Sequence, residues 1–236
     1  MGVVEGRPAM IDIDLQDVGL RSLNKRLHGV PPESNERRFR IANPQGGHSI
    51  AVGLDADLSI EVGGHVGFYC GGMNKQAEIV IHGHAGPGVA ENMMSGLVRV
   101  KGNASQMAGA SGHGGLLVIE GDASSRCGIS MKGIDIVVQG SVGHMSAFMA
   151  QRGDLVVCGD AGGDLGDSIY EARLFVRGSA ESLGADCIEK EMRAEHLESL
   201  VALLDKAAVS ADPKDFRRYG SARKLYNFNV DHADSY

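Results

Sequence analysis

The sequence contains no tryptophan and few other aromatic residues, with five tyrosines and six phenylalanines among 236 residues. Proteins commonly hold single-stranded bases by stacking them on aromatic side chains, so this scarcity disfavours such binding, and it weakens the case for carbohydrate binding too. Acidic residues outnumber basic ones by 30 to 23, and the resulting formal charge of −7 repels phosphate backbones. We therefore expect no nucleic-acid partner.

Signals for membranes and for metal sites are also missing from the sequence. No run approaches the ~20 apolar residues of a membrane span, and the first residues lack the basic-then-apolar order of a secretory signal. The four cysteines, at positions 70, 127, 158 and 187, form no Cys-x-x-Cys pair of the kind that zinc and iron–sulfur sites use. We expect a cytoplasmic chain with reduced thiols, no membrane contact and no cofactor of its own.

Glycine is abundant, with 34 residues, which is roughly twice the ~7% of average usage. Seven glycines recur at a constant step of 19 residues, at positions 64, 83, 102, 121, 140, 159 and 178. Aliphatic residues stand two and four positions before each one, from Ile60 and Val62 in the first repeat to Leu174 and Val176 in the last. This period-2 spacing predicts one strand per repeat, with both aliphatic positions facing the same side.

The remainder of each repeat is a turn region. A polar residue suited to a turn follows each glycine, from His65 to Ser179, and columns of small residues come after it. Nineteen residues are too few for a helix–turn–helix repeat, and the pattern has no 3.6-residue stripe. The sequence therefore predicts an all-β fold, a right-handed parallel β-helix that forms a single-stranded solenoid of about seven coils over residues 58–186.

No catalytic, cofactor-binding or metal residue is predicted. Phosphate loops, dinucleotide fingerprints and nucleophile elbows are absent from the sequence. His82 and His84 resemble a metal pair, and Asp122 and Asp160 a glycosidase pair, but all four fall at turn or outward positions of the repeat. We interpret them as surface residues.

The ends of the chain follow other patterns. Residues 1–57 are off-register and include a short helix expected near residues 17–27, which we interpret as a cap on the first coil. Residues 187–212 switch to a 3.6-residue period and predict an amphipathic helix that caps the far end or contacts a partner. Residues 213–236 form an aromatic and basic tail.

Two sets of residues are predicted to face partners. The outward position between the aliphatic ladders is apolar in four consecutive coils, and so large an apolar patch is usually covered, here either by another chain or by the chain's own termini. These four residues are Val118, Val137, Val156 and Phe175. The tail is interpreted as a docking arm because aromatic and arginine side chains anchor interfaces, with packing on its own β-helix and RNA binding as alternatives. Its anchors are Phe216, Arg217, Arg218, Tyr219, Tyr226 and Phe228.

Four sets of motifs stand out within residues 17–186. They are Asp17-Val-Gly-Leu-Arg21, Val66-Gly67 with Gly71-Gly72-Met73, Gly121-Asp-Ala123 with Met131-Lys-Gly133, and Gly159-Asp-Ala-Gly162. These motifs resemble the Gly-x-Gly-x-Gly β-helix family, which includes the C-terminal domain of the glutamate synthase large subunit and one of the chains of formylmethanofuran dehydrogenase. The tail segment Phe216-Arg-Arg-Tyr-Gly-Ser-Ala-Arg-Lys-Leu-Tyr-Asn-Phe-Asn229 is similar to the end of the stand-alone β-helix chain of N-methylglutamate synthase (methylamine–glutamate N-methyltransferase).

This resemblance implies a non-catalytic subunit of a hetero-oligomer. In N-methylglutamate synthase the β-helix chain accompanies an amidotransferase-like chain and a glutamate synthase-like chain that carries FMN and an iron–sulfur cluster, and the complex converts methylamine and L-glutamate to N-methyl-L-glutamate and ammonia. A subunit of a formylmethanofuran dehydrogenase-like complex and an independent binding scaffold are the alternatives. The sequence leaves open whether methylamine or ammonia is the nitrogen donor, and it leaves the stoichiometry open.

Overall fold

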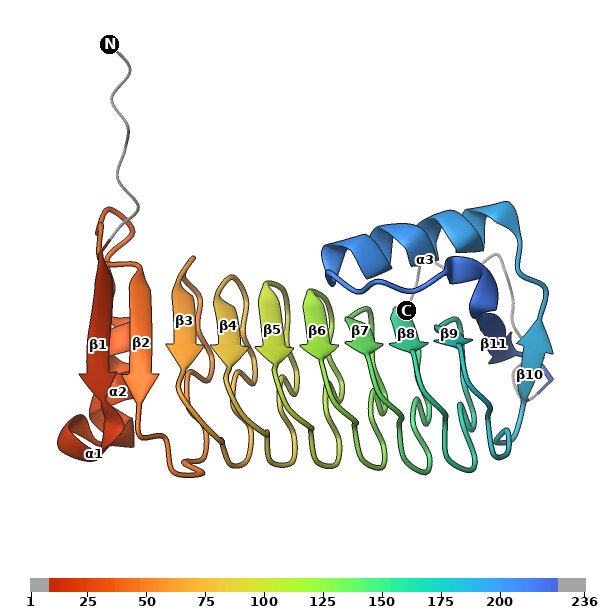
Figure 1. Cartoon of the computed structure of the whole chain (residues 1–236), viewed down its shortest axis with the longest axis horizontal. Helices are drawn as coiled ribbons and strands as arrows, with labels where there is room; N and C mark the ends of the chain where they lie inside the picture. The colour runs from red at the N-terminus through yellow and green to blue at the C-terminus, as the bar shows by residue number, and fades with distance from the viewer. Residues whose placement is uncertain (1–8, 225–236) are drawn as a thin grey trace, which may run out of the picture.

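The computed structural model describes residues 9–224, in which the chain winds repeatedly about one axis (Figure 1). Seven short strands lie side by side, one in each coil, and each pairs in parallel with the next. They are β3 (Ser59–Val62), β4 (Glu78–Ile81), β5 (Leu97–Val100), β6 (Leu116–Ile119), β7 (Asp135–Val138), β8 (Asp154–Val157) and β9 (Arg173–Val176). Val100 lies opposite Ile119, and Ile119 opposite Val138, so the 19-residue register and the parallel β-helix are confirmed.

The core consists of stacked columns of like side chains. The aliphatic ladders are fully buried, from Ile60 and Val62 in β3 to Leu174 and Val176 in β9. A third column, which runs from Val66 through Ala85 to Ala180, is linked from coil to coil by isolated parallel bridges. Because adjacent coils are separated by the ~4.8 Å of a hydrogen-bonded sheet, each side chain packs on its equivalents above and below.

A second ladder, built from side chains, links the coils at the glycine bend. The polar residue after each glycine accepts a hydrogen bond from the backbone N–H of its equivalent in the next coil. The distances are 2.9 Å from His84 N–H to His65 Nδ1 and 2.8 Å from Ser141 N–H to Asp122 Oδ1. The same bond links His84 to Asn103, Asn103 to Asp122, Ser141 to Asp160 and Asp160 to Ser179. This explains why histidine, asparagine, aspartate and serine share the position, since each provides an acceptor.

The N-terminal segment adds two strands to the sheet. We predicted residues 1–57 as an off-register cap, but β1 (Met10–Asp14) and β2 (Arg38–Ala42) continue the parallel pairing. Phe39 lies opposite Ile60 at a spacing of 21 residues, so a longer connection changes the repeat length without breaking the stack. The expected helix is present as α1 (Leu15–Val18) and α2 (Leu20–His28), which are separated at Gly19.

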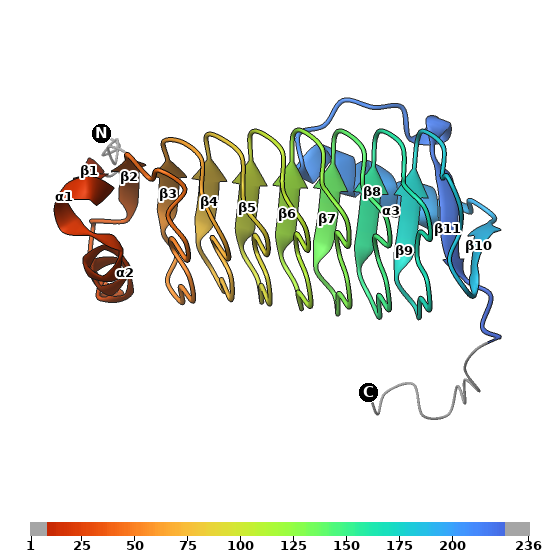
Figure 2. The ribbon, with the colours of Figure 1, turned by 90° about the horizontal axis from the view of Figure 1, so that it is seen from below.

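The C-terminal segment folds back on the solenoid. The predicted helix over 187–212 is shorter, because β10 (Cys187–Lys190) precedes α3 (Ala194–Lys206). A single 3-10 turn, η1 (Pro213–Asp215), leads to β11 (Arg217–Ser221), which lies antiparallel between β9 and β10. Figures 1 and 2 show α3 lying along one side of the last coils, away from the arcs on the lower edge of Figure 1. Within residues 9–224, no helix is long and apolar enough to span a bilayer.

We expect Gly153→Ala to destabilise the solenoid strongly. Gly153 has φ +101°, and an added Cβ would overlap the carbonyl oxygen of Ile134 in the preceding coil. Left-handed strain and backbone overlap together predict a loss of about 3 kcal/mol or more in the free energy of unfolding, measured by urea titration. Gly46→Ala is the control, because Gly46 has φ +71° but no atom within 4 Å of the added Cβ. Equal losses in the two variants would contradict this explanation.

The turn ladder predicts a pH-dependent contribution from Asp160. Hydrogen bonds from the backbone N–H and the hydroxyl of Ser179 lower the pKa of Asp160 below its usual value. The stabilisation from the carboxylate is therefore complete above the unfolded pKa of ~3.9 and is lost as the pH falls through the lower folded pKa. Asp160→Asn keeps a hydrogen-bond acceptor, and Asn103 already occupies the equivalent position in another coil. The asparagine side chain does not titrate. The stability difference between wild type and variant should shrink below about pH 4, whereas parallel unfolding curves would refute the assignment.

Candidate partner interface

The four apolar outward residues of β6–β9, which we name the apolar stripe and predicted to face a partner, are covered by the chain itself. Val118, Val137, Val156 and Phe175 are fully buried, and they form one cluster with residues of α3 and with Phe216. The residues of α3 in this cluster are Leu200, Leu203 and Leu204, followed by Ala207 at its C-cap. The partner assignment for these four residues is therefore corrected, since the second alternative, cover by the chain's own terminus, is what the structure shows.

Polar contacts fix both ends of this cover. Arg99 replaces the apolar residue of the stripe in β5, and its guanidinium donates to the carbonyl oxygen of Ala207 at 2.8 Å, which satisfies the C-terminus of α3. Arg173 forms two bonds of 2.6 Å to the buried carboxylate of Asp154 and reaches the hydroxyl of Ser199 on α3. The cover therefore extends over the four consecutive coils from β6 to β9, whose outward residues are all apolar.

The first part of the tail is not a free docking arm. Phe216 joins the cluster beneath α3, and Tyr219 in β11 packs into the main core. Arg217 donates to the carbonyl oxygen of Gly178 at 2.8 Å, and Arg218 donates to that of Glu191 at 3.0 Å. The docking-arm prediction is therefore wrong for Phe216 and Tyr219, because strand pairing with β9 and β10 holds the segment on its own solenoid and buries both rings. Arg217 stays exposed and Arg218 half-exposed, so their contact with a partner remains a prediction. Tyr226 and Phe228 lie outside the described residues.

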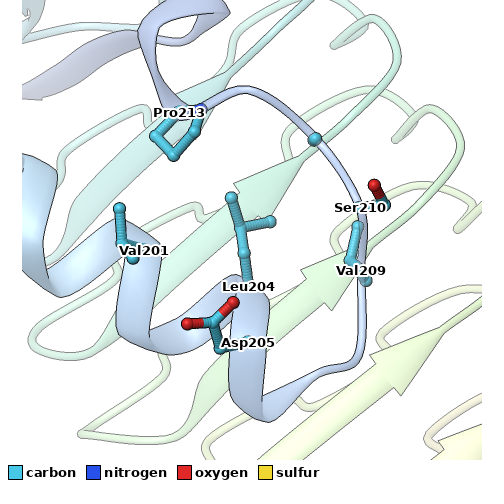
Figure 3. Close-up of a pocket in the computed structure, with 7 residues that line it drawn as sticks. Val201, Leu204, Asp205, Val209, Ser210 and Pro213 are labelled. Atoms are coloured by element: carbon cyan, nitrogen blue, oxygen red, sulfur yellow. The ribbon is translucent and has the colours of Figure 1, made fainter.

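A shallow hollow of about 300 Å³ lies between α3 and the chain that leaves it (Figure 3). Its lining is Val201, Leu204, Asp205, Val209, Ser210, Ala211 and Pro213. Asp205 is the one ionisable residue in this lining. The hollow therefore suits an apolar contact better than chemistry.

An aromatic and methionine patch on the first coils remains exposed, formed by Phe68, Tyr69 and Met73. The Phe68 ring stacks on His48, with centroids 4.5 Å apart, and its backbone N–H donates to His48 Nδ1 at 3.0 Å. The Tyr69 ring is tilted against Phe68 at 6.3 Å. The three residues are 45–52% exposed, so they place large apolar groups close together in sequence at the surface. We name this the aromatic patch.

The backbone explains how the aromatic patch projects outward. Tyr69 and Met73 have φ values of +61° and +55°, in the left-handed region that large side chains seldom adopt. The ring of Tyr69 lies over the next coil where Gly88 leaves room, since a Cβ there would sit 2.6 Å from the ring. The sequence analysis missed this patch. A signal was present, because Tyr69 is the one aromatic residue at this position of the repeat, where the following coils carry Gly88, Met107, Arg126, Met145 and Asp164.

The thiols of the solenoid are poorly suited to covalent chemistry. All four cysteines are buried and unpaired, as predicted. Burial raises the pKa of Cys70, Cys127 and Cys187 to about 12, so the reactive thiolate is scarce at neutral pH. In the part of the chain that the structure describes, no three His, Cys, Asp or Glu side chains are grouped to hold a metal ion.

Comparison with known proteins identifies the family. No protein-family model matches the chain. The chain is 65% identical over 225 residues to Protein GlxC of Rhizobium meliloti (strain 1021), a match that covers 95% of this chain and 99% of the relative. The chain belongs to the GlxC family.

We expect Leu200→Asp to detach α3 and expose the stripe. Leu200 is fully buried against the sheet, and an unpaired carboxylate there would cost several kcal/mol. An apolar dye such as ANS should then fluoresce severalfold more strongly, while far-ultraviolet circular dichroism keeps its strand signal. Val201→Asp is the matched control, because the neighbouring side chain is 40% exposed. Identical dye binding by both variants would show that α3 does not provide the cover.

Proposed function

We propose that this chain is a non-catalytic β-helix subunit of a glutamate synthase-like complex, most specifically of N-methylglutamate synthase. In this role it holds an amidotransferase-like chain and an FMN- and iron–sulfur-containing synthase chain in a fixed relation. Membership of the GlxC family and the resemblance of the repeat motifs to the glutamate synthase β-helix support a glutamate synthase-related role. The observation that carries the proposal is the match to GlxC over nearly the whole chain, and the aromatic patch, fixed on a stiff scaffold, supplies a surface for a partner.

The stiffness follows from the way the coils are joined. Each coil shares strand hydrogen bonds with both neighbours, and the side-chain ladder at the glycine bend adds another bond per coil. The interior is filled by fully buried aliphatic side chains, as in β6 and β7, so it holds no open channel there. A passage for ammonia or methylamine between the partner chains would therefore run along the outside of the solenoid, between this chain and a partner.

The aromatic patch has the properties of an interface anchor. Aromatic and methionine side chains are enriched in interfaces, and a few rigid aromatic anchors carry most of the binding energy. His48 fixes the ring of Phe68 before any partner arrives, which reduces the entropy lost on binding. In this proposal the catalytic groups, FMN and the cluster belong to the synthase chain.

We expect the double variant Phe68→Ser with Tyr69→Ser to weaken assembly with co-expressed amidotransferase-like and synthase chains by about 100-fold in affinity, since anchor residues typically contribute 2 kcal/mol or more. Size-exclusion chromatography and calorimetry of the purified chains provide the measurement. The wild-type assembly should be yellow-brown from the partner's flavin and cluster and should turn over methylamine and glutamate.

The control is Ile188→Ser, because Ile188 is equally exposed at 43% but lies on β10 at the far end of the solenoid. Assembly should survive this change. A wild-type chain that catalyses the reaction alone, or one that forms no complex with either chain, would overturn the proposed function. Unchanged assembly of the double variant would remove the aromatic patch from the interface.

A further inference from the structure

A line of exposed side chains crosses four consecutive coils, two or three residues before each of the strands β5–β8 begins. It consists of Met94, His113, Lys132 and Arg152. The backbone places them one above another, since His113 N–H donates to the carbonyl oxygen of Met93 at 2.7 Å, and Lys132 and Arg152 face each other across a parallel bridge. We name this the basic line.

Small, uncharged residues border the basic line on both sides. Two positions before its members stand Asn92, Ser111, Ser130 and Ala150, and one position after them stand Ser95, Gly114, Gly133 and Gly153. These two columns carry no charged side chain, and both Lys132 and Arg152 are exposed. Such a surface stands out on a chain with a formal charge of −7.

Ion pairs within the chain occur at the two ends of this column but not in its middle. One coil before Met94, Lys75 pairs with Asp55 at 2.6 Å, and one coil after Arg152, Glu171 pairs with Arg223 at 2.9 Å. Among residues 9–224, neither Lys132 nor Arg152 forms an ion pair. The fold thus neutralises the ends of the column and leaves two adjacent cations available beside the exposed Met94.

We propose that the basic line binds an acidic segment of a protein partner, with carboxylates on Lys132 and Arg152 and an apolar side chain on Met94. Complementary charge steers association and fixes the register between two surfaces, and a methionine adapts to the apolar group that it meets. A protein is favoured over a nucleic acid because the line has no aromatic side chain on which bases stack. This inference rests on the proposed function, for which it names the chemistry of one partner surface.

The test uses the full chain assembled with the amidotransferase-like and synthase chains. Lys132→Glu with Arg152→Glu should lower the affinity by about tenfold or more and flatten its dependence on salt. The matched control, Arg21→Glu with Lys25→Glu, makes the same charge change at exposed positions on α2 and should change affinity less than about twofold. In the wild-type complex, Lys132 should also be protected from acetylation, while Lys25 reacts as it does in the free chain.

The outcomes separate the two proposals. If the wild-type complex forms but Lys132 is acetylated as fast as in the free chain, the basic line does not bind a partner, and the proposed function stands. If no complex forms, the proposed function fails, and the free chain is titrated with poly-L-glutamate and with a single-stranded oligonucleotide of equal charge. Binding of poly-L-glutamate that is lost in the Lys132→Glu, Arg152→Glu variant supports an acidic partner segment. Absence of such binding, or tighter binding of the oligonucleotide, overturns the proposal that the basic line binds an acidic protein segment.

Discussion

The constraint on which the structure depends is the alignment of hydrogen bonds between successive coils. Every coil donates to and accepts from its neighbours, so in β3–β9 each strand residue is held directly over the residue 19 positions earlier. Inward columns must therefore contain side chains that pack on copies of themselves, such as valine, isoleucine and alanine. Outward columns carry no such restriction. The polar residues at the glycine bend are restricted to an intermediate degree. They vary in size and charge, but each must supply a hydrogen-bond acceptor for the next coil.

The outward column of the sheet shows how this freedom is used. It is mixed in the first coils, with Glu61, Val80 and Arg99, and is apolar in every coil from Val118 to Phe175, which is the part that α3 covers. Burial of each such side chain contributes roughly 1.5–3 kcal/mol, which is enough to hold a helix of 13 residues that would be marginal alone. Arg99 marks the boundary because its guanidinium satisfies the carbonyl at the end of the helix. The extent of the cover is thus encoded in one column of the solenoid.

The 19-residue period predicted which residues of successive coils stack on one another. It did not predict which distant segments of the chain pack on the outside of the solenoid. The stacking of Val100, Ile119 and Val138 followed from the spacing of residues in one repeat. The contact of Val137 with α3 did not follow from this spacing. An apolar outward face shows that something covers it, but it does not show which segment of the chain does so. Tyr219 was misinterpreted for the same reason, since an aromatic residue suits an interface and a core equally well. The aromatic patch was missed because single exposed residues stand out only when their column is compared across coils.

A scaffold of this kind separates stability from recognition. The inward columns and the ladder fix the distance between any two outward side chains, so surfaces several coils apart keep their separation when either one binds. The basic line begins at Met94, one coil after the aromatic patch, and its cations Lys132 and Arg152 lie two and three coils further along the same rigid body. Partner groups bound at the patch and at these cations would be held apart by the number of coils between them, a distance that changes only by whole coils of ~4.8 Å. This is a physical reason for a multi-subunit enzyme to place a β-solenoid between its catalytic chains.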